Sequence, residues 1–142
     1  MTAQPRSKEA RRYYRVAMQR FGEAELLYQD ERFTTAAVYL AGYGVECMLK
    51  ALVLSSVPSS QECEVLRGFH GAKAHDYEWL LAMYRKQGDP ALPKKLVRHF
   101  TTVNSWSTDM RYSPRMIRLA EAKSFVDSAA KIMLWADGRI GQ

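Results

Sequence analysis

The sequence predicts an all-α protein, a single-domain up-down bundle of four to five helices. Apolar residues recur at steps of three and four along most of the chain, which is the period of amphipathic helices. No segment alternates apolar and polar residues as a half-buried strand would. Long helices joined by short connections form bundles of this kind. The length of 142 residues is typical of one domain, so residues 1–142 are expected to form a single unit.

The two N-terminal helices are the longest that the pattern predicts, and they should form an antiparallel hairpin. After a frayed start over residues 1–6, Ser7 is a good N-cap for a first helix that continues to about Gln29. The second helix covers residues 33–55 and is apolar nearly all round, as expected of the central helix of a bundle.

The second helix also contains residue types that a buried helix normally avoids. Gly42 and Gly44 each lower helix propensity by about 1 kcal/mol relative to Ala, so we expect them to mark the close approach of a neighbouring helix. Glu46 and Lys50 stand one turn apart and interrupt the apolar run, which argues against a membrane span. No membrane partner is predicted.

The remaining helices are shorter and are separated by segments rich in Gly, Pro and Ser. Ser113 and Pro114 are suited to start the last helix, and Gly138 should stop it. The predicted elements are a loop over 55–73, a helix from Asp76 to the turn at 88–90, a helix over 92–110 and a last helix over 114–137.

Composition and charge limit the class of protein. The chain is 47% hydrophobic and 25% charged, which excludes collagen-like and wholly disordered chains. Its 21 basic and 15 acidic side chains give a net charge of +6, which favours acidic partners such as nucleic acid. Two cysteines do not make a disulfide framework, and the polar start has no signal-peptide pattern. We therefore expect a cytoplasmic protein.

Three segments, taken in order, resemble the HEPN family (higher eukaryotes and prokaryotes nucleotide-binding domain). They are AAVYLAGYGVECMLKAL at 36–52, GAKAHDYEWLL at 71–81 and WSTDMRY at 106–112, and the similarity extends from about Tyr13 to Trp135. The resemblance implies a compact bundle of four to five helices, often a homodimer, that binds RNA or nucleotides. It also implies a role in a toxin–antitoxin or defence pair beside a small nucleotidyltransferase.

Catalytic members of that family are metal-independent ribonucleases that carry an Arg–His motif near the start of a late helix. Arg111 matches the arginine of this motif, but Met116 stands where the histidine would be. A thioether cannot transfer protons, whereas histidine can do so near neutral pH. We therefore predict a binding domain rather than an enzyme. The alternative is a metal-independent endoribonuclease with a non-standard site, for which Arg111, His75 and Arg115 are the catalytic candidates.

The candidate binding residues also have structural interpretations. Glu46 and Lys50 suit a buried polar network in which Arg111 is a partner for Glu46. Asp76 suits a helix cap, and Tyr112 is expected to be partly exposed, where it could stack on a base. The candidate residues for RNA or nucleotide binding are Glu46, Lys50, His75, Asp76, Arg111, Tyr112 and Arg115.

Arginines are concentrated in two parts of the chain, the first 20 residues and the segment that holds Arg111, Arg115 and Arg118. The last three are spaced to share one helical face, and guanidinium groups bind phosphate in bidentate fashion. Cys63, His70 and His75 lack the spacing of a zinc site, so neither a metal nor a cofactor is predicted.

Three hypotheses for the function stay open at this point. The first is RNA, nucleotide or partner-protein binding without cleavage. The second is the unconventional ribonuclease described above. The third is an interaction module, a homodimer that pairs with a nucleotidyltransferase and in which Tyr112 or another exposed tyrosine is a modification target.

Overall fold

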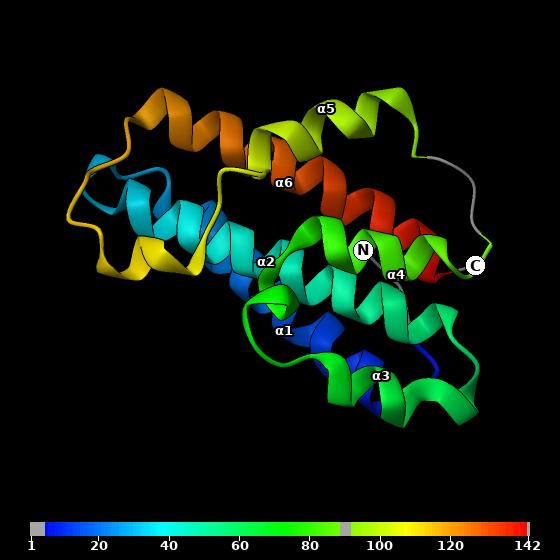
Figure 1. Cartoon of the computed structure of the whole chain (residues 1–142). Helices are drawn as coiled ribbons and strands as arrows, with labels where there is room; N and C mark the ends of the chain where they lie inside the picture. Colours follow the sequence, from blue (N-terminus) through cyan, green and yellow to red (C-terminus); the bar gives the residue numbers. More distant parts are fainter. Residues whose placement is uncertain (1–4, 89–91, 142) are drawn as a thin grey trace.

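The computed structural model describes residues 5–88 and 92–141, and these residues are all-helical, as predicted (Figure 1). The α-helices are α1 (Lys8–Leu27), α2 (Thr34–Ser56), α3 (Glu62–Gly68), α4 (Tyr77–Arg85), α5 (Lys94–Val103) and α6 (Leu119–Ile140). The connections contain four 3-10 turns, η1 (Glu31–Phe33), η2 (Ser59–Gln61), η3 (Ala72–His75) and η4 (Thr108–Tyr112).

Helix α1 begins where its sequence predicts. The Ser7 hydroxyl accepts a hydrogen bond from the Ala10 amide at 2.9 Å, which satisfies one of the unpaired donors of the first turn. The buried residues of α1 follow one face of the helix. They are Ala10, Tyr14, Ala17, Phe21 and Ala24. The start of the chain, residues 1–6, was expected to be frayed. Residues 1–4 lie outside the described part of the chain. The carbonyls of Pro5 and Arg6 accept hydrogen bonds from the Arg11 side chain.

Helix α2 is the central helix, as predicted from its all-round apolar character. Every residue from Gly44 to Leu54 is buried, and α1, α4 and α6 pack against it. Figure 1 shows α1 and α2 side by side, joined at one end by a short connection. In the described part of the chain, Glu31–Ser56 is long and apolar enough to cross a membrane, and 83% of its apolar window is buried inside the protein. Core helices pass the same test, so this result is weak evidence for a span.

The two glycines of α2 lie where other groups come close. A Cβ atom at Gly44 would lie 3.2 Å from the Ala17 carbonyl of α1, which is the helix approach that the sequence predicts. Gly42 faces a side chain instead of a helix, because a Cβ there would overlap the indole of Trp106. That indole donates to the Tyr39 carbonyl at 3.0 Å and stacks on Tyr77, with 5.6 Å between ring centroids.

The predicted loop over 55–73 is wrong, because it contains α3, so the described chain has six α-helices rather than four or five. Glu62 and Glu64 in the first turn and Arg67 in the last turn suit the helix dipole, and they offset the short length of this helix. Val65 and Leu66 pack against the core, and this contact gives the helix its buried side. The Ser and Gly residues of this segment favour a loop, and the sequence prediction gave them more weight than the charges and apolar residues of α3.

The prediction of one helix over 92–110 is also wrong. Helix α5 ends at Val103, and the chain forms the separate turn η4 after Ser107. The Ser107 hydroxyl accepts from the Asp109 amide at 3.1 Å. Polar side chains that bond to nearby backbone in this way compete with a continuous helix.

The last helix differs from its prediction at both ends. It begins at Leu119 rather than near Pro114, because hydroxyls of α2 hold the preceding residues in a non-helical conformation: Thr34 donates to the Ile117 carbonyl and Thr35 to that of Arg115. It continues past Gly138 to Ile140, which packs against the core. This packing outweighs the low helix propensity of one glycine.

We expect Gly42→Ala to lower the free energy of unfolding by about 1–3 kcal/mol, because the new methyl group would overlap the Trp106 indole. Gly22→Ala in α1 is the matched control, since a Cβ there meets no neighbour. It should raise stability by up to about 1 kcal/mol through helix propensity. Urea unfolding of both variants checks the pair. Equal effects in the two variants would contradict this packing.

Candidate functional site

An ion pair lies inside the protein on α2. Glu46 is 2% exposed and Lys50 is 6% exposed, and Lys50 Nζ donates to Glu46 Oε2 at 2.7 Å. Their spacing of one helical turn brings the two side chains together on the same face. A buried charge is costly unless it is paired, so each group makes the burial of the other tolerable.

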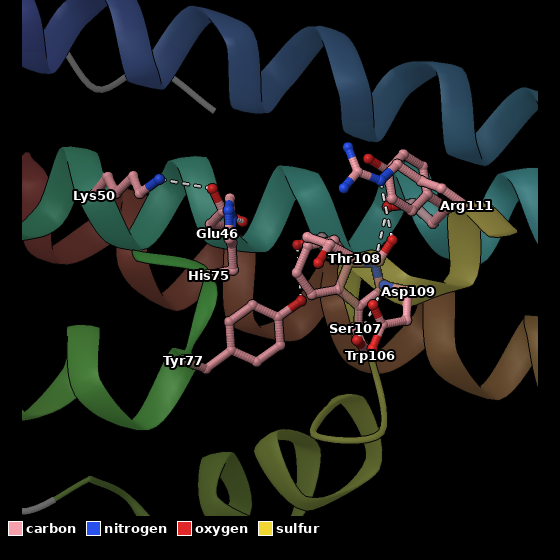
Figure 2. A network of polar contacts seen from close by, with 11 residues as sticks. Glu46, Lys50, His75, Tyr77, Trp106, Ser107, Thr108, Asp109 and Arg111 are labelled. Atoms are coloured by element: carbon pink, nitrogen blue, oxygen red, sulfur yellow. Dashed lines mark hydrogen bonds and ion pairs between the residues drawn. The ribbon is translucent and has the colours of Figure 1, made fainter. Parts of the chain in front are cut away.

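The second oxygen of this carboxylate faces the connection before α4. His75 Nδ1 lies 2.8 Å from Glu46 Oε1, and the His75 side chain is 43% exposed (Figure 2). The next residue, Asp76, caps α4 by accepting hydrogen bonds from the amides of Glu78 and Trp79. The cap fixes the start of α4 and thereby keeps His75 over Glu46.

Aromatic rings enclose the Lys50 ammonium group. It lies 5.7 Å from the centre of the Tyr13 ring and 5.4 Å from that of Phe69, which are cation–π distances. The two rings also meet edge to face, with centroids 5.9 Å apart. Side chains from α1, from α2 and from the residue after α3 therefore meet at Lys50.

Two buried groups beside the ion pair, the Cys47 thiol and the Tyr77 hydroxyl, have raised pKa values and stay protonated at neutral pH. Burial raises the pKa of the Cys47 thiol to about 12, and the Glu46 carboxylate acts in the same direction, so no thiolate is available as a nucleophile. Burial also raises the pKa of Tyr77 well above its ordinary value. The Tyr77 hydroxyl donates to the Gly42 carbonyl at 2.7 Å. This arrangement favours the structural interpretation of Glu46 and Lys50.

The predicted pairing of Glu46 with Arg111 is wrong. Glu46 has Lys50 and His75 as its partners, whereas Arg111 Nε donates to the Thr108 carbonyl at 3.0 Å. In Figure 2, Arg111 lies on η4, along α2 from the ion pair. Thr108 is close in sequence and leaves the guanidinium group at the surface, where it needs no buried carboxylate.

A second group of candidate residues lies on the largely exposed segment 111–118, which runs from the last two residues of η4 to the residue before α6. Tyr112 is 80% exposed, as expected, and the Arg111 guanidinium carbon lies 5.4 Å from the centre of its ring. The predicted helical face of Arg111, Arg115 and Arg118 is wrong, because only Arg111 lies in a helical turn. All three arginines are nevertheless exposed.

A pocket of about 340 Å³ opens beside this segment. Its walls come from α2, the end of α5, η4, the segment 111–118 and the first turns of α6. Arg115 lines this pocket, and the other binding candidates do not. The pocket could not be predicted from the sequence because one wall comes from α2 and the rest from residues 102–125, far along the chain. The only signal was the run of Ser and Thr residues after Phe100.

The exposed face of α1 forms a basic groove. Arg12 pairs with Glu9 at 2.8 Å, and Arg11 bonds to the preceding backbone. The groove is lined by Lys8, Glu9, Arg11, Arg12, Arg15, Val16 and Gln19. Four cations against one carboxylate give this face a net positive charge. Within residues 5–88 and 92–141, no three His, Cys, Asp or Glu side chains are grouped to hold a metal ion.

Comparison of the chain with protein-family models, with curated proteins and with solved structures found no match.

We expect Lys50→Met to lower the free energy of unfolding by about 3 kcal/mol, because it leaves the buried Glu46 carboxylate without its closest cation. The double variant Glu46→Gln/Lys50→Met should be more stable than the single variant, since neither charge is then left alone. Urea unfolding of the wild type, the two single variants Glu46→Gln and Lys50→Met and the double variant measures the coupling free energy between the two side chains. Additive effects of the two substitutions would contradict a buried ion pair.

Proposed function

We propose that this chain is an HEPN-like domain, an up-down helical bundle built on an antiparallel hairpin of α1 and α2, that binds single-stranded RNA without cleaving it. The observation that carries the proposal is the exposed pair of Arg111 and Tyr112 on η4. Unpaired bases stack on exposed aromatic rings, and guanidinium groups bind the adjoining phosphates.

The charges around Tyr112 support a phosphate backbone as the ligand. Arg115 and Arg118 are exposed on the same segment, and Glu121 approaches Arg115 only at 3.5 Å. An exposed ion pair of that length contributes little, so a phosphate can replace the carboxylate at small cost. The net charge of +6 and the basic groove of α1 add long-range attraction.

The segment 111–118 contains no histidine, the side chain best suited to proton transfer near neutral pH. Met116, which is 55% exposed, has no titratable group. His75 Nδ1 bonds to the buried Glu46 carboxylate, and Arg111 bonds to Thr108. Binding without cleavage is therefore better supported than the alternative, a metal-independent endoribonuclease with a non-standard site.

Two further parts of the proposal, a homodimer and a role in a toxin–antitoxin or defence pair with a nucleotidyltransferase, rest on the family resemblance alone. A cytoplasmic location rests on the cysteine content instead, since two cysteines do not make a disulfide framework. Co-expression with the product of a neighbouring nucleotidyltransferase gene, where there is one, would test the pairing.

The test of RNA binding is fluorescence anisotropy with a short labelled single-stranded RNA of mixed sequence. Tyr112→Ala should weaken binding about tenfold, whereas Tyr112→Phe, which keeps the ring, should bind like the wild type. Arg111→Ala should also lower the slope of log affinity against log salt by about one. Arg67→Ala on the exposed surface of α3 removes the same charge elsewhere and is the matched control.

The same RNA, incubated with the protein in EDTA, distinguishes binding from cleavage. We expect intact RNA with the wild type and with all variants. Cleavage by the wild type that is lost in Arg111→Ala would establish the ribonuclease instead. Absence of binding at low salt would contradict RNA as the ligand.

A further inference from the structure

We propose that the pocket between α2, the end of α5, η4 and α6 binds a small zwitterion, an α-amino acid with an apolar side chain. The observation behind this is a pair of opposite charges, Arg115 and Glu121, which lines a cavity that also has apolar and hydroxyl groups on its walls. The inference concerns a ligand other than RNA and does not depend on RNA binding.

The size and lining of the pocket fit a small amphipathic molecule. Its volume of about 340 Å³ is at the lower end of the range for small-molecule sites. Apolar side chains from four different elements form part of the wall: Val38, Met110, Ile117 and Phe125. They provide a surface for an apolar side chain of leucine or phenylalanine size. A long acyl chain or an oligonucleotide would not fit within this volume.

The charged pair determines what kind of head group the pocket accepts. Arg115 Nη2 lies 3.5 Å from Glu121 Oε2, and these side chains are 72% and 55% exposed. Such a loose, solvated pair is weak, so a ligand can replace it at small cost. The ammonium and carboxylate of an α-amino acid are attached to the same carbon, so they can meet Glu121 and Arg115 at the same time. A zwitterion meets both charges of the pair, whereas a phosphate group would meet only Arg115.

Hydroxyl groups hold the backbone of this site in position. Thr35 Oγ1 donates to the Arg115 carbonyl at 3.0 Å and accepts from the Ile117 amide at 3.0 Å. Ser113 Oγ accepts from the Arg115 amide at 3.3 Å. The backbone of Arg115 is therefore fixed before a ligand arrives, which reduces the entropy that binding would cost. The Ser124 hydroxyl also lines the pocket, where it can bond to the head group.

Titrations of the isotopically labelled protein, followed by amide NMR spectra, test the proposal with defined probes. L-Phenylalanine and L-leucine should cause saturable shifts at the pocket residues, such as Thr35 and Ser124. Two analogues that each lack one charge, 2-phenylethylamine and 3-phenylpropionate, should bind about tenfold more weakly than phenylalanine. Equal or tighter binding of either analogue would overturn the assignment to a zwitterion.

Charge variants then identify the residues responsible. Arg115→Gln and Glu121→Gln should each weaken phenylalanine binding about tenfold. Lys123→Gln, on the exposed surface of α6 and outside the pocket, should leave it unchanged. All three positions are exposed, so unfolding curves should match the wild type. No saturable shift with either amino acid, or unchanged affinity in both pocket variants, would overturn the proposal. RNA is absent from this experiment, so the outcome is separate from that of RNA binding.

Discussion

The burial of α2 on every side is the constraint on which the rest of the fold depends. A helix that is apolar all round must be covered all round, because exposed apolar surface costs free energy in proportion to its area. Helices α1, α4 and α6 provide this cover. The closest approaches coincide with the smallest residues, since Gly44 faces the backbone of α1 and Gly42 faces the Trp106 indole.

The same burial explains why two charged residues of α2 pair with each other. Glu46 and Lys50 lie within the covered region, so they must satisfy one another, and the Tyr13 and Phe69 rings complete the enclosure. His75 is the only described residue outside α2 that pairs with Glu46. By contrast, the segment 111–118 is attached to α2 through Thr34 and Thr35 and leaves its arginines in solvent. The protein thus has a buried polar network and a separate exposed basic surface.

Much of the fold could be predicted from local patterns, and much of the site could not. The cap at Ser7, the central α2 and the cap at Asp76 follow from residue types and spacing within one turn. The break after Val103 comes with a local bond, in which the Ser107 hydroxyl accepts from the Asp109 amide. The late start of α6 depends on hydroxyl bonds from α2, which lies about 80 residues earlier in the chain. Contacts across such distances leave no periodic signal. The Glu46–His75 contact and the pocket were hidden for the same reason.

The division between a buried polar network and the exposed surface proposed to bind RNA is tested most directly by two substitutions, each measured in two ways. Glu46→Gln and Arg111→Ala are compared in their free energies of unfolding and in their affinities for single-stranded RNA. The account predicts that Glu46→Gln lowers stability and leaves the RNA affinity of the folded protein unchanged. Arg111→Ala should leave stability unchanged and weaken RNA binding, because Arg111 is exposed on η4. A Glu46→Gln protein that unfolds like the wild type but no longer binds RNA would contradict it.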